Sequence, residues 1–185
     1  MRRELWFTSY DPAPIRVAFD RVPALMGAHI DFKPGWTMDD CVATETHMLI
    51  SYQANGCIEE PTAVARAVTA GILAATDGRF DASRDLIFRE TATVHFDQRI
   101  VQILGSMRPD CQAKLPAGTT FETMITLEEG PAGVMNCSLA AKASTDSAIM
   151  AGAMQTIRPF IEQYLQGRIE TFARELTEDM VRLGW

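Results

Sequence analysis

One long amphipathic stretch, from Ser144 to Leu183, constrains the fold more than any other feature of this chain. A single helix of about forty residues would be about 60 Å long, more than a domain of this size needs. Pro159 removes the excess, because a proline inside a helix kinks it or makes it restart, and a straight segment of about 24 residues remains. The apolar stripe predicted at 100° per residue is made of Met150, Met154, Ile157, Ile161, Tyr164, Leu165, Phe172, Leu176 and Leu183.

Such a helix is apolar on one side only and must lie across an extended partner. No second long helix is available to form a bundle, so we expect a curved antiparallel sheet. The earlier chain supplies segments with strand-like composition or alternation: Leu5–Tyr10, Ile30–Trp36, Cys41–Tyr52, Leu86–Phe96, Ile100–Leu104, Thr119–Glu128 and Val134–Lys142.

Two further helices are expected before the terminal one. A short helix has Pro14 in its first turn and continues to Val22, and a second covers Thr62–Thr76. Arg108–Gly118, which is polar and contains two prolines, reads as a loop. The prediction is an α+β fold in one domain, residues 1–185, with about seven antiparallel strands gripping a long C-terminal helix.

Composition excludes several classes of protein. Seventeen basic against 24 acidic residues give a net charge of −7, which argues against a nucleic-acid binder. No apolar run reaches the length of about 20 residues that a transmembrane segment needs. The four cysteines are scattered and the N-terminal residues lack the apolar core of a secretory signal, so free thiols and a cytoplasmic location are expected.

Two local runs extend this prediction to a family. The run Phe7–Pro14, followed by Val17, resembles a first strand that leads into a proline-containing helix start. Gly167–Glu170 in the last helix is similar to the Gly-Lys-Ile-Glu type of run found in some START-like proteins. Together with the order of elements, these runs resemble the helix-grip fold of the START-like (SRPBCC-type) superfamily, and the resemblance implies an apolar cavity between sheet and helix.

The expected cavity would be lined by the inner rows of the strands and by the helix stripe. Large apolar side chains would form the pocket, and isolated polar residues would orient the ligand. The candidate ligand-binding residues are Met48, Tyr52, Phe88, Glu90, Phe96, Phe121, Ile125, Tyr164, Arg168 and Phe172.

Glu90 and Arg168 are the polar members of this set, and each has two interpretations. Glu90 interrupts the apolar row of its strand, so it is either a cavity acid that binds or protonates a ligand or, more commonly at such positions, a residue that a bulge or strand end exposes to water. Arg168 borders the helix stripe. It either contacts a ligand carboxylate or phosphate or, as is more usual, packs its stem on the sheet and extends its head into solvent.

The remaining polar residues predict no defined chemistry. His47 and His95 fall on polar strand faces, His29 lies in a segment of uncertain structure, and no hydrolase or metalloprotease motif accompanies them. No metal site and no cofactor are expected.

Three functions fit these features. The first is binding or carriage of a small hydrophobic molecule or lipid. The second is a cavity enzyme of the cyclase, dehydratase or hydrolase type. The third is a non-catalytic interaction subunit with a filled core, with a homodimer as one possibility.

Overall fold

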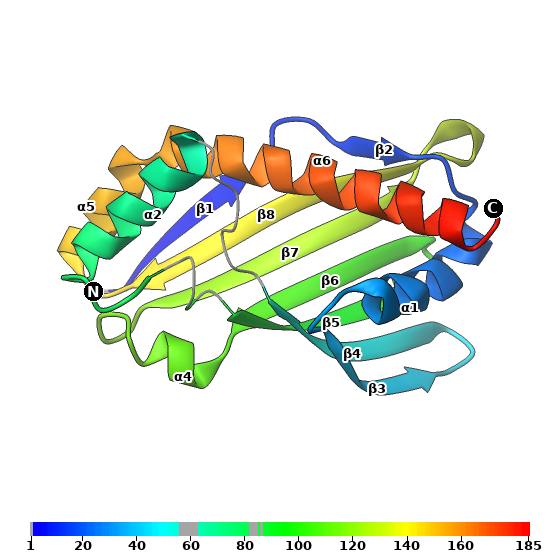
Figure 1. Ribbon diagram of the computed structural model, residues 1–185, viewed down its shortest axis with the longest axis horizontal. Helices are drawn as coiled ribbons and strands as arrows, with labels where there is room; N and C mark the ends of the chain where they lie inside the picture. Colours follow the sequence, from blue (N-terminus) through cyan, green and yellow to red (C-terminus); the bar gives the residue numbers. More distant parts are fainter. Residues whose placement is uncertain (1, 56–62, 82–84, 86) are drawn as a thin grey trace.

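A computed structural model describes residues 2–55, 63–81, 85 and 87–185 (Figure 1). Its centre is an antiparallel sheet in the order β1-β8-β7-β6-β5-β4-β3, with β2 also paired to β8. The strands are β1 Arg3–Thr8, β2 Ala13–Ile15, β3 Thr37–Ala43, β4 His47–Asn55, β5 Ile87–His95, β6 Ile100–Met107, β7 Thr120–Glu129 and β8 Met135–Thr145.

Helices gather on one face of this sheet. They are α1 Val22–Phe32, α2 Ala63–Ala75, α5 Ala148–Thr156 and α6 Arg158–Arg182, while the short helix α4 Pro109–Gln112 lies in the connection between β6 and β7. Figure 1 shows α6 running across the β1, β8 and β7 side of the sheet, with α1 near its C-terminal end and α2 beside α5 at the other end. An α+β fold in which an antiparallel sheet holds a long C-terminal helix is therefore confirmed.

The break at Pro159 is also confirmed. α5 ends at Thr156, and α6 begins at Arg158 with the proline in its first turn, where the missing N–H costs no hydrogen bond. The start of α6 is attached to β1, because Arg158 Nη1 donates to the Trp6 carbonyl oxygen at 2.7 Å and the guanidinium lies over the Phe7 ring. Buried positions then recur every three or four residues along the helix: Leu165, Ile169, Ala173, Leu176, Asp179 and Met180.

The predictions for the N-terminal segment were wrong in two places. The helix expected from Pro14 to Val22 does not form: its start belongs to the short strand β2, whose Ala13 and Ile15 are buried while Pro14 faces outward, and helical structure begins only with a 3₁₀ turn at Phe19–Arg21. A proline is tolerated there because β2 is a short segment at the sheet margin and needs no donor at that position. The strand expected at Ile30–Trp36 is also absent, because α1 continues to Phe32 and buries residues at helical spacing.

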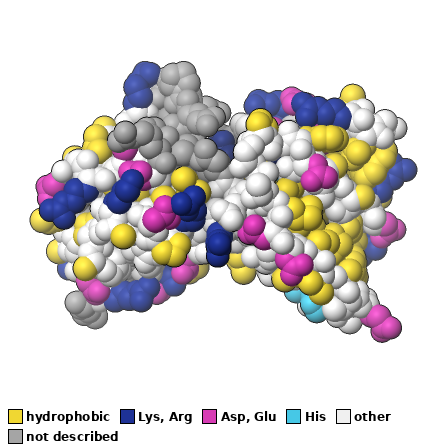
Figure 2. Space-filling view, turned by 60° about the horizontal axis from the view of Figure 1, so that its bottom comes forward, with side chains coloured by type: hydrophobic (Ala, Val, Ile, Leu, Met, Phe, Trp, Pro, Cys, Tyr) yellow, Lys and Arg dark blue, Asp and Glu magenta, His cyan; other side chains and the backbone are white. Residues whose placement is uncertain are grey.

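Cys41–Tyr52 was predicted as one strand and is a hairpin of β3 and β4. Thr44 makes the turn without glycine or proline, because its hydroxyl accepts a hydrogen bond from the His47 amide at 3.1 Å. β3 lies at the sheet edge and all its residues are exposed. Figure 2 shows hydrophobic side chains gathered on the half of the molecule that carries this hairpin.

The strands from β5 to β8 and the helix α2 agree with the predicted ranges, apart from shifts at their ends. The expected loop at Arg108–Gly118 contains the short helix α4. Among the described residues, no helix is both long enough and apolar enough to span a membrane.

Candidate functional site

A cavity of about 190 Å³ lies between the inner face of the sheet and α6. Strands β1, β4, β5, β7 and β8 form one wall, and residues of α1, α2, α5 and α6 complete it. The lining is predominantly apolar and includes Phe7, Val68, Ile72, Phe88, Phe121, Ile125, Leu139, Met154, Ile161, Leu165, Ile169 and Phe172.

Most of the candidate residues lie at this cavity. Phe88, Glu90, Phe121, Ile125, Tyr164, Arg168 and Phe172 line it. Met48, Tyr52 and Phe96 do not: Met48 and Phe96 are partly buried against the hydrophobic core, and Tyr52 is fully buried behind the wall. Tyr52 still acts on the site through its neighbour Glu90.

Glu90 is held at the cavity wall in the middle of β5. Its strand register places it opposite Tyr52 of β4 on one side and Gly105 of β6 on the other. The Tyr52 side chain forms a hydrogen bond with the Glu90 carboxyl group. Glu90 therefore faces the cavity from a regular strand, and no bulge turns it into solvent.

Burial raises the pKa of Glu90 from its ordinary value, and the hydrogen bond from Tyr52 and the charge of Arg168 only partly oppose this effect. The pKa of Tyr52 is also raised, first by burial and then by the nearby Glu90 charge, so its hydroxyl keeps its proton. A carboxyl group in this setting can bind a proton more readily than a surface glutamate and present it to a ligand oxygen.

Gly105 makes room for this arrangement. A side chain at Gly105 would overlap Thr123 Oγ1 and lie 3.4 Å from Glu90 Cγ. The glycine sits between Glu90 and Thr123 in the register of three adjacent strands. The missing side chain therefore lets the Thr123 hydroxyl pack against the Gly105 backbone, next to the Glu90 side chain.

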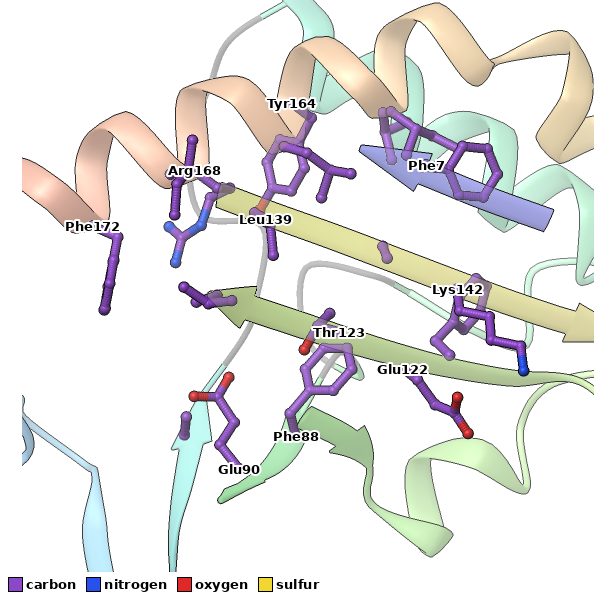
Figure 3. Close-up of a pocket in the computed structure, with 18 of the residues that line it drawn as sticks. Phe7, Phe88, Glu90, Glu122, Thr123, Leu139, Lys142, Tyr164, Arg168 and Phe172 are labelled. Atoms are coloured by element: carbon purple, nitrogen blue, oxygen red, sulfur yellow. The ribbon is translucent and has the colours of Figure 1, made fainter. Parts of the chain in front are cut away.

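Arg168 extends from α6 toward Glu90 across the cavity (Figure 3). Its charge interacts with Glu90, but it forms no hydrogen bond or ion pair with any residue that the structure describes. The two lysines at the cavity are paired, since Lys33 Nζ lies 2.6 Å from Glu175 Oε1 and Lys142 Nζ lies 2.9 Å from Glu4 Oε1. Within the described chain, Arg168 is thus the cavity cation whose hydrogen-bond donors are not used by the protein.

His29 and Asp179 form a second polar pair at the wall. His29 Nδ1 lies 2.7 Å from Asp179 Oδ2, and the side chains are only 1% and 5% exposed. His29 is one of the residues that line the cavity. Two aromatic rings, those of Trp36 and Phe172, pack edge to face against its imidazole ring, with centroid distances of 5.6 and 5.5 Å.

The other imidazole nitrogen, His29 Nε2, is buried and has no hydrogen-bond partner among the described residues. Leaving a buried polar atom without a partner costs about 1–3 kcal/mol. Burial lowers the pKa of His29, with Lys33 adding to this effect, although the hydrogen bond to Asp179 and the charges of Asp179 and Glu175 oppose it.

Trp36 connects the two polar pairs. Its indole stacks on the Tyr52 ring at 5.4 Å between centroids, while its edge contact reaches His29. The Tyr52 side chain in turn forms the hydrogen bond with the Glu90 carboxyl group. One aromatic wall therefore positions both the buried histidine and the partly buried Glu90 carboxyl group.

The His29–Asp179 pair was missed at the level of sequence. His29 falls in a segment whose structure the sequence pattern left uncertain, and the partners are 150 residues apart. One signal was available, because Asp179 lies three residues after Leu176 on the apolar stripe of the last helix. A carboxylate on an apolar stripe requires a buried partner.

The other predicted polar residues do not meet at this site. His47 and His95 are opposite each other in the β4–β5 register and do not line the cavity. In the part of the chain that the structure describes, no group of three or more histidine, cysteine, aspartate or glutamate residues is placed to hold a metal ion.

No protein-family model matches the sequence, and no curated protein matches it either. Similar solved structures include norcoclaurine synthase from Thalictrum flavum in complex with dopamine and hydroxybenzaldehyde, with 9% identity, coverage of 98% of this chain and 88% of that chain, and a TM-score of 0.46. The Zhui aromatase/cyclase from Streptomyces sp. R1128 has 12% identity, 99% and 96% coverage, and a TM-score of 0.41. The lipid transfer domain of human StarD13 has 8% identity, 91% and 74% coverage, and a TM-score of 0.41.

The fold follows from the chain's own elements. A strand and a helix precede a run of antiparallel strands, and a long C-terminal helix lies across the sheet with a cavity beneath it. An antiparallel sheet that holds a long C-terminal helix in this way is a helix-grip arrangement.

Proposed function

We propose that this protein binds a small, mainly apolar molecule with an anionic group in the cavity beneath α6. The observation that carries the proposal is Arg168, a cation in a predominantly apolar cavity whose donors meet no acceptor among the residues that the structure describes. Guanidinium donors match a carboxylate or phosphate in a bidentate geometry. Such a group would supply the acceptors that the described protein does not.

The size of the cavity supports a small ligand. A dry cavity of about 150 Å³ in a protein core accepts benzene. A cavity of about 190 Å³ thus suits a molecule of one or two rings, and a lipid with two acyl chains is larger than this space. We therefore propose a small molecule in place of a lipid.

The apolar lining residues and the polar lining residues would contact different parts of the ligand. Phe88, Phe121 and Phe172 would contact the apolar body of the ligand. Arg168 would bind its anionic group, and Glu90, which takes up a proton readily, would donate a hydrogen bond to an oxygen. Each of these roles matches the residue's place in the wall.

Binding of 2-naphthoate, compared with its neutral analogue 2-naphthamide, tests the proposal. Trp36 belongs to the wall, so quenching of tryptophan fluorescence can follow the titration, and calorimetry gives the affinity. We expect Arg168→Met, which keeps the apolar stem, to weaken naphthoate binding by about 1.5–3 kcal/mol, the usual contribution of a charged hydrogen bond. The affinity for the amide should change little.

Arg174→Met is the matched control, because Arg174 is on the same helix but is exposed and does not line this cavity. It should leave both affinities unchanged. The proposal fails if naphthoate does not bind, or if Arg168→Met weakens acid and amide equally.

A further inference from the structure

His47 and His95 lie opposite each other on two neighbouring strands. His47 of β4 is the Cα partner of His95 of β5 in an antiparallel ladder. The Phe96 amide donates to the Thr46 carbonyl oxygen at 3.0 Å, so the ladder bonds flank the histidines and do not join them. Side chains directly opposite in such a non-hydrogen-bonded pair lie on one face of the sheet, with Cβ atoms about 4.5–5.5 Å apart.

Both imidazoles belong to the outer face of the sheet. Val94, which precedes His95 in β5, is fully buried, so the period of two places His95 on the opposite, outer side. Neither histidine lines the cavity, and each is partly exposed. Figure 2 shows histidine at the surface of the half of the molecule that carries the β3–β4 hairpin. Dissolved ions therefore reach this pair without entering the cavity.

One ring nitrogen of His47 is held by the turn between β3 and β4. His47 Nδ1 lies 3.1 Å from Thr44 Oγ1 and 3.2 Å from Thr46 Oγ1. A hydrogen bond at one ring nitrogen orients the imidazole and determines which nitrogen is left to bind a metal ion. For His47 that nitrogen is Nε2.

Carboxylates lie on both turns beside this pair. Glu45 is in the turn before His47, Asp97 is in the turn after His95, and both acids are exposed. Arg99, the cation of the second turn, is paired with Glu129. Negative charge on either side of the two imidazoles raises the local concentration of a divalent cation.

We propose that His47 and His95 together bind a divalent late transition-metal ion on the outer face of the sheet. Imidazole nitrogens suit Cu²⁺, Ni²⁺ and Zn²⁺, with the highest affinity expected for Cu²⁺. Two protein ligands leave coordination positions for water, so this is an open site; among the described residues, no group of three or more metal-ligating side chains is placed to enclose an ion. Because the site is outside the cavity, the proposal is independent of the proposed function.

Calorimetric titration with Ni²⁺ at slightly basic pH, where imidazole is unprotonated, tests the site. The reference protein carries Cys41→Ser, because Cys41 is exposed and a thiolate is itself a metal ligand. We expect one Ni²⁺ per chain. His47→Gln or His95→Gln should each weaken the affinity at least about tenfold, the smallest loss usual even when a ligand loses its hydrogen-bond partner. Thr93→Ala, two residues before His95 on the same face of β5, is the control and should leave the affinity unchanged.

Two further measurements do not depend on the calorimetric affinity. The electron paramagnetic resonance spectrum of bound Cu²⁺ should show hyperfine splitting from two nitrogens in the reference protein and from one in either histidine variant. Ni²⁺ can join the two strands only in the folded chain, so it should raise the melting temperature of the reference protein more than that of His47→Gln.

Three results would overturn the proposal: no binding of Ni²⁺ or Cu²⁺, two Ni²⁺ ions per chain, or reference-protein affinity in both histidine variants. The last two would mean that each histidine binds separately or not at all. Circular dichroism checks that the variants fold, and if one histidine variant does not, the other decides.

Discussion

His29 Nδ1 lies 2.7 Å from Asp179 Oδ2, and this buried contact joins α1 to the C-terminal turns of α6. Arg182 contacts the other carboxylate oxygen at 3.3 Å. The long helix is therefore attached at both ends, by Arg158 to β1 and by Asp179 to α1. The cavity lies between these two attachments.

Removing one member of this buried pair should be costly. Asp179→Ala leaves the imidazole N–H, whose ring is neutral at pH 7 because burial lowers its pKa, without its acceptor, and an unsatisfied buried donor costs about 1–3 kcal/mol. We expect the free energy of unfolding, measured by urea denaturation, to fall by that amount. Glu178→Ala is the control, since its ion pair with Arg174 is exposed and 3.9 Å long, and such pairs contribute about 0–1 kcal/mol. Equal effects of the two substitutions would contradict the role given to the buried pair.

Glu90 should make stability depend on pH in a defined direction. Burial raises its pKa in the folded protein above the ordinary value of 4.5, so the folded state binds its proton more tightly than the unfolded state does. Glu90 therefore lowers stability as the pH rises above 4.5, until the folded carboxyl group has also ionised. The change is at most about 1.4 kcal/mol per pH unit.

Glu90→Gln carries no ionisable group and should lack this loss. The difference in unfolding free energy between variant and wild type should increase from pH 4.5 toward neutrality in the variant's favour. Urea denaturation at several pH values measures it. A difference that stays constant over this range would show that the Glu90 carboxyl group is not desolvated.

Gly105 should be intolerant of even one added carbon. Gly105→Ala would place its Cβ against Thr123 Oγ1, so we expect a loss of about 1–3 kcal/mol in unfolding free energy and weaker 2-naphthoate binding. Adding Thr123→Ala removes the overlapping oxygen and should recover part of the stability. In contrast, Gly167→Ala on α6 meets no atom within 4 Å and should stabilise the helix by about 1 kcal/mol. Full stability of Gly105→Ala alone would argue against a tight wall at this position.

Local patterns in the sequence predicted the large elements and part of the site. The apolar stripe and Pro159 predicted a restarted terminal helix, and the alternation of Leu86–Phe96 placed Glu90 on an inner row. Periodicity succeeds at such places because each long element has one face to bury. It failed at Ala13–Ile15 and at Thr44, where a three-residue strand and a threonine turn are too short to produce a periodic signal.

By itself, then, the sequence determined the fold class and the terminal helix, and it identified Glu90 and Arg168 as candidates while leaving open whether each faces the cavity or solvent. Only the tertiary structure decided that His29 meets Asp179, that Tyr52 lies behind the wall, and that the Thr123 hydroxyl packs against Gly105 beside Glu90. The reason is physical: hydrophobic periodicity is a property of neighbouring residues, whereas a hydrogen bond between partners 150 positions apart exists only after separate elements have packed together.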